Sequence, residues 1–197
     1  MEFLKNHWAT LTLVGIIAVY FGVSMGTNGC PMCVAGNAVA KVFGYDPDSV
    51  STSGKVVTET QAADWSATRL DGTEMRSEDL KGKVAVVVYW ATWCSPCIKE
   101  IPTLVALRNE FDKERVEILG VSVDSPGKDL QPFINSKGIN YEIARQSESM
   151  EKAFGQVRYL PTMFILDKEG KVHYQHTGLV SHDVIQDQIQ SLLTQNA

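Results

Sequence analysis

The sequence contains no cysteine outside two short motifs. Its four cysteines form two Cys-x-x-Cys pairs, Cys30/Cys33 and Cys94/Cys97. A small secreted protein held together by several disulfides carries cysteines at scattered positions, so the pattern argues against a disulfide scaffold. It indicates redox chemistry or metal binding.

The chain also lacks a cluster of basic residues. Its 18 lysines and arginines are outnumbered by 23 aspartates and glutamates, which gives a net charge of -5 and argues against a nucleic-acid partner. A hydrophobic content of 44% and a charged content of 21% are those of an ordinary folded protein. A length of 197 residues allows one domain with appendages.

One stretch near the N-terminus has no charged residue at all. Residues 8–26 contain neither acid nor base and are rich in Leu, Val, Ile and Ala. As a helix they would be about 28 Å long, close to the roughly 30 Å hydrocarbon core of a bilayer. We predict that residues 1–26 form an uncleaved transmembrane anchor. A cleaved signal peptide, acylation of Cys30 as in a lipoprotein and a buried core helix are the alternatives.

A juxtamembrane segment follows the predicted anchor. Residues 27–60 begin with the first Cys-x-x-Cys motif and continue through a stretch rich in Gly, Ser, Thr and Asp, which is typical of a linker. We expect a folded domain over residues 61–197.

The most informative stretch of that domain surrounds the second motif. Residues 84–90 are apolar and rich in valine, as expected of a buried strand, and apolar residues recur at helical spacing after Cys97. A helix that starts next to Cys94 turns its free N–H groups toward the thiol, and in such settings the thiol pKa falls from about 8.5 to about 7 or lower. Cys97, one turn further, is placed to attack a mixed disulfide formed on Cys94. A structural zinc site would need a second ligand pair nearby, and none flanks this motif.

Strands and helices alternate through the remainder of the predicted domain. We expect a hairpin, then three further strands and two helices around the central strand–motif–helix unit. These are residues 65–75 for the hairpin, 116–123, 162–166 and 171–176 for the strands, and 130–138 and 184–193 for the helices. This order predicts an α/β domain with a central mixed sheet covered by helices on both faces.

Three segments of the domain resemble one family. The run WATWCSPC followed by KEIP, the block FGQVRYLPTMFILD at residues 154–167 and GVSVD at residues 120–124 resemble the membrane-anchored, thioredoxin-like thiol–disulfide oxidoreductases of bacteria. That family includes cytochrome c maturation proteins. The resemblance covers roughly residues 61–197 and implies a thioredoxin-like fold. It also implies a cis Leu160–Pro161 bond packed beside Cys94, with Pro161 part of the catalytic site and Trp93 and Leu160 in contact with substrate.

The resemblance further implies a cellular setting. It places the chain in the bacterial inner membrane as a single-pass protein, with its catalytic domain on the periplasmic side. Its partners would be protein disulfide substrates and a membrane-embedded electron donor, and its redox group would be the Cys94–Cys97 disulfide without a bound cofactor or metal. Two other functions compete with this one. A peroxiredoxin-like peroxidase would have proline and threonine where Val87 and Ala91 stand, and a thiolate metal-binding or copper-delivery protein would use either motif.

Glu100 lies three residues after Cys97, hence on the same helical face. It is either an ordinary solvated glutamate or a proton acceptor that helps Cys97 to become a thiolate. Ordinary thioredoxins keep a buried aspartate at the position of Val88, which makes Glu100 the candidate acid–base group. Tyr159 stands where relatives often have glycine, and we expect it to narrow or reshape the substrate groove.

The first motif has its own hypothesis. Cys30 and Cys33 would form a second redox pair at the membrane face, which passes electrons between a membrane partner and Cys94–Cys97. A static local disulfide, a four-cysteine zinc site shared across a dimer and lipidation of Cys30 are the alternatives.

Overall fold

The computed structural model describes residues 55–195. The predicted anchor at residues 1–26, Cys30 and Cys33 lie outside the described residues. Among the helices of the described part, none has the length and apolar character needed to cross a bilayer.

The described residues form one mixed sheet with helices on both faces, as predicted. The strand order is β1-β8-β7-β4-β5-β6-β2-β3. The strands are β1 (Lys55–Gln61), β2 (Ser66–Arg69), β3 (Glu74–Arg76), β4 (Val84–Trp90), β5 (Val116–Ser122), β6 (Glu142–Arg145), β7 (Thr162–Leu166) and β8 (Lys171–Thr177). The helices are the 3₁₀ helix η1 (Ser77–Leu80) and the α-helices α3 (Ser95–Glu110), α4 (Gln131–Lys137), α5 (Glu148–Phe154) and α6 (His182–Gln195).

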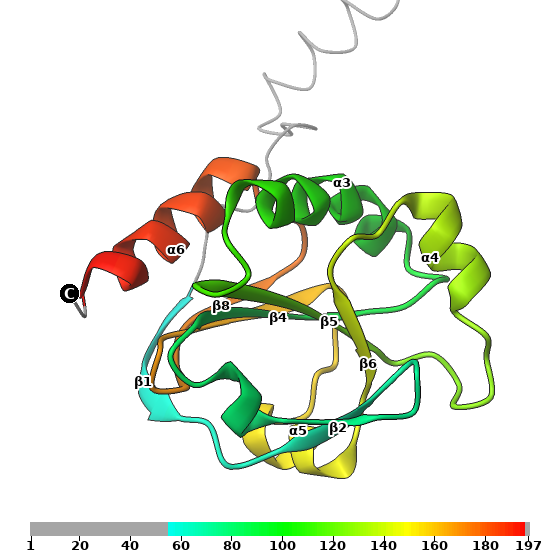
Figure 1. Cartoon of the computed structure of the whole chain (residues 1–197), viewed down its shortest axis with the longest axis horizontal. Coiled ribbons are helices and arrows are strands. Elements are labelled where there is room, and N and C mark those ends of the chain that lie inside the picture. The colour runs from blue at the N-terminus through cyan, green and yellow to red at the C-terminus, as the bar shows by residue number, and fades with distance from the viewer. Residues whose placement is uncertain (1–54, 196–197) are drawn as a thin grey trace, which may run out of the picture. The chain divides into compact units, whose positions relative to one another are not determined.

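Strand β4 is the centre of the sheet, and all seven of its residues are buried. It pairs in parallel with β5 and antiparallel with β7. Its side chains alternate between two cores: Val86 and Val88 pack on the side of α3, α4 and α6, whereas Val87 and Tyr89 pack on the side of α5 and the β2–β3 hairpin. Figure 1 shows α3, α4 and α6 on one face of the sheet and α5 with β2 on the other.

Three short elements were not predicted from the sequence. Strand β6 has four residues and helix α5 has seven, and both fall between the predicted helix over residues 130–138 and strand β7. Strand β1 lies in the segment that was assigned to the linker, and it pairs with β8. These short segments lack the continuous apolar runs of β4 and β7, so hydrophobic periodicity does not distinguish them from loops. Pairing within the sheet orders the two strands.

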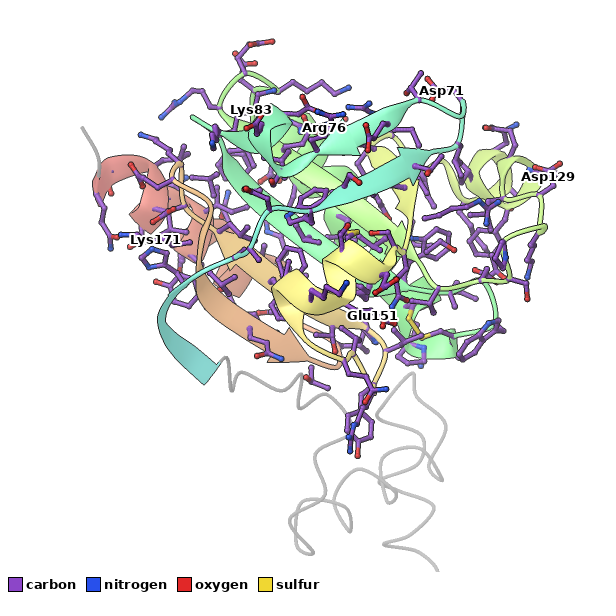
Figure 2. All side chains as sticks on the ribbon, turned by 90° about the horizontal axis from the view of Figure 1, so that it is seen from below. Asp71, Arg76, Lys83, Asp129, Glu151 and Lys171 are labelled. Carbon is purple, nitrogen blue, oxygen red and sulfur yellow. A yellow bond between two sulfur atoms is a disulfide. The ribbon has the colours of Figure 1, made fainter. Side chains whose placement is uncertain are left out.

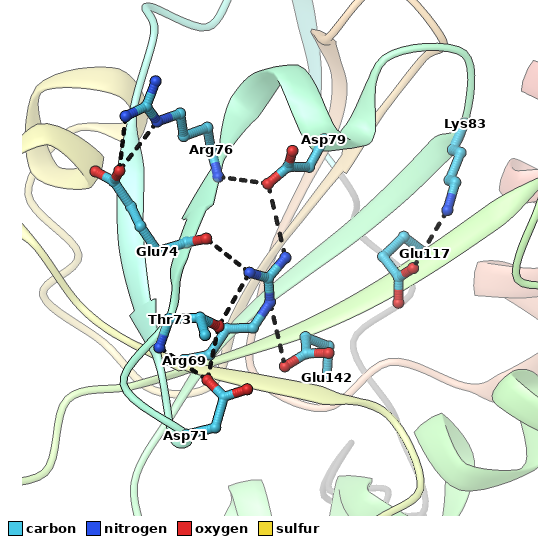
Figure 3. Close-up of polar contacts among 9 residues, drawn as sticks. All are labelled: Arg69, Asp71, Thr73, Glu74, Arg76, Asp79, Lys83, Glu117 and Glu142. Carbon is cyan, nitrogen blue, oxygen red and sulfur yellow. Dashed lines mark hydrogen bonds and ion pairs between the residues drawn. The ribbon is translucent and has the colours of Figure 1, made fainter.

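A polar network fixes the β2–β3 hairpin to its neighbours (Figure 3). The Arg69 guanidinium donates to the Glu74 carbonyl at 2.7 Å and to Thr73 Oγ1 at 3.4 Å. It also forms ion pairs with Asp79 of η1 at 3.6 Å and Glu142 of β6 at 3.7 Å. Arg69 thus connects β2 to β3, η1 and β6.

Candidate active site

Cys94 and Cys97 form a disulfide at the start of α3. Cys94 is the N-cap residue, and the Cys97 N–H donates to Cys94 Sγ at 3.2 Å. The prediction that a helix begins next to Cys94 is therefore confirmed. Pro96 occupies the first turn, where a missing N–H costs nothing because that group has no partner within the helix.

The two cysteines have similar exposure, but only Cys94 lines a groove at the surface of the described structure. Cys94 is 6% exposed and Cys97 is 2% exposed. Cys94 borders an open groove, and Cys97 does not. The remaining groove residues come from the motif, the ends of β5 and β6, helix α5 and the segment before β7: Trp93, Pro96, Val123, Gln146, Glu151, Gln156, Val157, Arg158, Tyr159 and Leu160. Figure 2 shows Glu151 on the part of α5 that lies toward the disulfide, drawn as a yellow bond.

The segment before β7 completes this groove. The Leu160–Pro161 peptide bond is cis, which confirms the expectation from the resemblance. Trp93 and Tyr159 are 69% and 71% exposed, and they are the exposed large hydrophobic residues of the described chain. Both residues border the groove, so Tyr159 adds a solvent-exposed aromatic ring to its rim.

Glu100 is buried, which excludes its interpretation as a solvated surface residue. It is 2% exposed, and its only hydrogen bond in the described structure is from the Val180 N–H to Oε1 at 3.2 Å. Its other oxygen, Oε2, has no hydrogen-bond partner. Burial raises the pKa of Glu100 to about 7, although the Val180 hydrogen bond acts in the opposite direction. The neighbouring Tyr141 is buried as well, and burial followed by the charge of Glu100 raises its pKa above the ordinary value. Glu100 can therefore exchange a proton near neutral pH.

Asp124 is the site residue that sequence reasoning did not single out. It is 7% exposed, and it accepts hydrogen bonds from the Thr92 N–H at 2.9 Å and the Thr92 hydroxyl at 2.7 Å. The Ser122 hydroxyl donates to it at 3.1 Å, and Lys128 Nζ pairs with it at 3.1 Å. Burial alone would raise the pKa of Asp124, but these hydrogen bonds outweigh burial and lower it. The signal was present in the sequence, because an aspartate two residues beyond a parallel strand lies at the same sheet edge as the motif.

Within residues 55–195, no group of three or more His, Cys, Asp or Glu side chains is arranged to hold a metal ion. Of the predicted site residues, the structure brings Trp93, Cys94 and Leu160 to one groove, whereas Cys97, Glu100 and Pro161 are buried and do not line it.

Comparisons with known proteins identify the family of this chain. Residues 58–175 match the AhpC/TSA family. The thiol-disulfide oxidoreductase ResA of Geobacillus thermodenitrificans is 34% identical over 139 residues, which are 70% of this chain and 79% of that protein. The protein of the same name from Halalkalibacterium halodurans is 24% identical over 188 residues, 95% of each chain.

Solved structures show the same fold. A thiol:disulfide interchange protein of the thioredoxin family from Chlorobium tepidum superposes with a TM-score of 0.62 and 27% identity, over 70% of this chain and 98% of that one. A secreted thiol-disulfide isomerase from Corynebacterium glutamicum superposes with a TM-score of 0.65 and 22% identity, over 75% of this chain and 95% of that one. The chain has the thioredoxin-like fold, it belongs to the AhpC/TSA family, and it is a thiol–disulfide oxidoreductase.

Proposed function

We propose that this enzyme reduces disulfides of partner proteins through a mixed disulfide on Cys94. The Cys94 thiolate attacks one sulfur of the partner disulfide, forms a new S–S bond and releases the other partner sulfur as a thiolate. The Cys97 thiolate then attacks Cys94 Sγ, closes the Cys94–Cys97 disulfide and releases the second partner thiolate. The partner gains two electrons and two protons, and the enzyme disulfide needs a dithiol donor to restore it.

The observation that carries this proposal is the position of Cys94 as the N-cap residue of α3 at the edge of the groove. The unpaired N–H groups and the positive end of the helix favour the thiolate of the first cysteine. The second cysteine lies one turn inside the helix and away from the groove, so it attacks Cys94 Sγ and not the partner disulfide.

Glu100 serves the second step in this proposal. Cys97 must lose its proton before it can attack, and both residues are buried on one face of α3. A carboxylate with a pKa of about 7 can accept that proton near neutral pH. Val88, at the place of the usual thioredoxin aspartate, is buried and cannot do so.

Partner recognition falls to the groove. Trp93 and Tyr159 offer exposed apolar surface, and Leu160 borders the same groove as Cys94. The substrates we propose are disulfides in extended or unfolded polypeptides, among them the cytochrome c precursors that the family resemblance suggests.

We also propose that residues 1–26 anchor the enzyme in the bacterial inner membrane, with residues 61–197 on the periplasmic side. The uncharged run over residues 8–26 supports this, because its length matches the hydrocarbon core. A membrane-embedded donor would restore the Cys94–Cys97 dithiol. Carbonate extraction of the full chain from membranes, and protease access to the domain in spheroplasts, test the anchor and its orientation. Release of intact, full-length chain by carbonate would contradict the anchor.

Cys30 and Cys33 follow the anchor in sequence, and we propose that they relay electrons from that donor. Strand β1 begins at Lys55, so residues 34–54 connect the first motif to the sheet. A flexible chain of about 21 residues spans about 25 Å, which would let the two motifs meet. The test compares donor-driven reduction of Cys94–Cys97 in the wild type with that in the Cys30→Ser/Cys33→Ser double variant. Unchanged reduction in the double variant would rule out the relay.

The mixed disulfide itself is tested by trapping. Cys97→Ala should accumulate partner proteins covalently bound to Cys94, whereas the matched Cys94→Ala variant should trap none. Alkylation of the reduced wild type near pH 7, followed by peptide mass spectrometry, should modify Cys94 first. Faster alkylation of Cys97 would reverse the assigned roles, and peroxide consumption at a rate comparable with disulfide reduction would favour the peroxidase instead.

A further inference from the structure

The loop between β4 and Cys94 is held by residues that follow the end of β5. Strands β4 and β5 run in parallel with Trp90 opposite Ser122, and the Val123 N–H continues the ladder by donating to the Trp90 carbonyl at 3.0 Å. Thr92 and Asp124 each lie two residues beyond this matched pair. The register of the sheet therefore brings Asp124 to the loop that carries the reactive cysteine.

That loop is a tight turn closed at Cys94. The Cys94 N–H donates to the Ala91 carbonyl at 3.1 Å, so Thr92 is the second residue of a four-residue turn that ends at the reactive cysteine. Both donors of Thr92, its N–H and its hydroxyl, are bound to the two oxygens of Asp124. A shift of Asp124 would displace the turn and, with it, the start of α3.

Lys128 balances the charge of this buried carboxylate. Its Nζ lies 3.1 Å from Asp124 Oδ1 and also contacts Thr92 Oγ1. The loop that carries Lys128 is held in turn by Arg145, whose guanidinium donates to the carbonyls of Ser125 and Lys128. The lysine side chain is 44% exposed, whereas the Asp124 side chain is 1% exposed.

Other charged groups around Cys94 are arranged differently. Glu151 and Arg158 border the groove from α5 and the segment before β7, and both are exposed. Glu100 lies one turn beyond Cys97, with Tyr141 nearby. Within the described structure, Asp124 is the carboxylate that accepts hydrogen bonds from residues 91–94.

We propose that Asp124, Thr92 and Lys128 form a charge-paired clamp that positions the turn before Cys94 and keeps a neutral ion pair beside its thiolate. Asp124 is a positioning residue in this proposal, since it acts on Cys94 through Thr92. The inference rests on the proposed role of Cys94 as the attacking thiol.

The test measures the alkylation rate of reduced Cys94 between pH 5 and 10 at low ionic strength, with peptide mass spectrometry to identify the modified cysteine. Thr92 is two residues from Cys94, so the clamp lies within about 10 Å of the thiol. An unpaired unit charge at that distance shifts a pKa by about half a unit to one unit. Lys128→Met, which leaves Asp124 unpaired, should raise the pKa of Cys94 by that amount. Asp124→Asn, which leaves Lys128 unpaired, should lower it, and the double variant should return close to the wild type.

Two controls separate the clamp from general effects. Lys128→Arg keeps the charge and should keep the pKa of Cys94. Lys152→Met breaks an exposed ion pair with Glu148 on α5 that does not touch residues 91–94, and it should also leave this pKa unchanged. Shifts of the same sign in Lys128→Met and Asp124→Asn, or no shift in either, would overturn the proposal. If Asp124→Asn does not fold, the Lys128→Met and Lys128→Arg pair decides. Alkylation of Cys97 before Cys94 would instead contradict the proposed function itself.

Discussion

Two carboxylates are buried near the active-site disulfide, and their surroundings give them opposite acidities. Asp124, 7% exposed, accepts hydrogen bonds from Thr92 and Ser122 and pairs with Lys128. Glu100, 2% exposed, has the Val180 N–H on one oxygen and no hydrogen-bond partner on the other. The pKa of Asp124 is lowered, whereas that of Glu100 is raised to about 7. Burial is common to both, so the number of donors decides which carboxylate keeps its charge.

The comparison assigns the two groups different tasks. A carboxylate that stays ionised across the working pH range can hold a loop without change, as Asp124 does. A carboxylate with a single donor can take up and release a proton, as Glu100 can. The following experiments test this difference, from the largest expected effect to the smallest.

Removal of the clamped carboxylate should have the largest effect. Asp124→Ala leaves the Thr92 N–H, the Ser122 hydroxyl and Lys128 without their acceptor, and we expect a loss of about 3 kcal/mol in the free energy of unfolding. Urea denaturation at pH 7.5 measures it. Asp187→Ala, at an exposed position of α6, serves as the control. A loss no larger than that of the control would show that the clamp contributes no stability.

The second-largest effect should be on the pH dependence of stability, and its sign should differ between the two residues. Folding raises the pKa of Glu100, so the folded state binds its proton more tightly than the unfolded state. Stability therefore falls as the pH rises from the unfolded value near 4.5 to about 7, by about 2 kcal/mol between pH 5 and pH 7. This decline should disappear in Glu100→Gln.

Asp124 should behave in the opposite way. Its pKa is lowered on folding, so its contribution is present above the unfolded pKa and is lost as the pH falls through the folded pKa. Urea titrations of the wild type, Glu100→Gln and Asp124→Asn from pH 3 to pH 8 separate the two windows. If Glu100→Gln keeps the decline between pH 5 and 7, another group causes it.

Glu100→Gln should slow closure of the disulfide by about tenfold at pH 7.5, because glutamine cannot accept the Cys97 proton. Single-turnover kinetics with a preformed mixed disulfide on Cys94 measures this step, and the initial attack by Cys94 should change less. Glu110→Gln, on the exposed end of the same helix, is the matched control. An unchanged pH profile of Cys97 in Glu100→Gln would remove Glu100 from the mechanism.

Added salt should weaken the contribution of Asp124 to stability slightly and leave that of Glu100 unchanged. Lys128 is partly exposed, so its pairing with Asp124 should contribute about 0.5 kcal/mol at low ionic strength and less in 0.5 M salt. Comparison of Lys128→Met with the wild type at both salt concentrations measures this. Glu100 has no cationic hydrogen-bond or ion-pair partner in the described structure, so the effect of Glu100→Gln on stability should not depend on salt.

Sequence reasoning predicted the parts of this site that follow from local pattern. The apolar run of β4, the Cys-x-x-Cys spacing and the helical periodicity after it together predicted the disulfide at the start of a helix. The family resemblance supplied the cis Leu160–Pro161 bond, which the valine-rich strands and their spacing would not have indicated.

What sequence reasoning missed depends on long-range packing. The burial of Glu100 requires Val180, eighty residues away, and the clamp on Thr92 requires Asp124 from the next strand. Neither contact leaves a periodic signal, since each involves one polar residue at a loop or helix face. Strand β6 and helix α5 were missed for a related reason, because short elements are ordered by their neighbours.

The order of strands in the sheet has a consequence for how this domain tolerates change. The reactive turn, the clamp and the Leu160–Pro161 segment adjoin the ends of β4, β5 and β7, and these strands are adjacent in the sheet. The remaining strands lie outside this trio, β8 and β1 on one side and β6, β2 and β3 on the other. Insertions in the β2–β3 turn or the β7–β8 turn would add residues to the domain without separating the three central strands. The margins of the sheet can therefore change while the dithiol chemistry at its centre stays fixed.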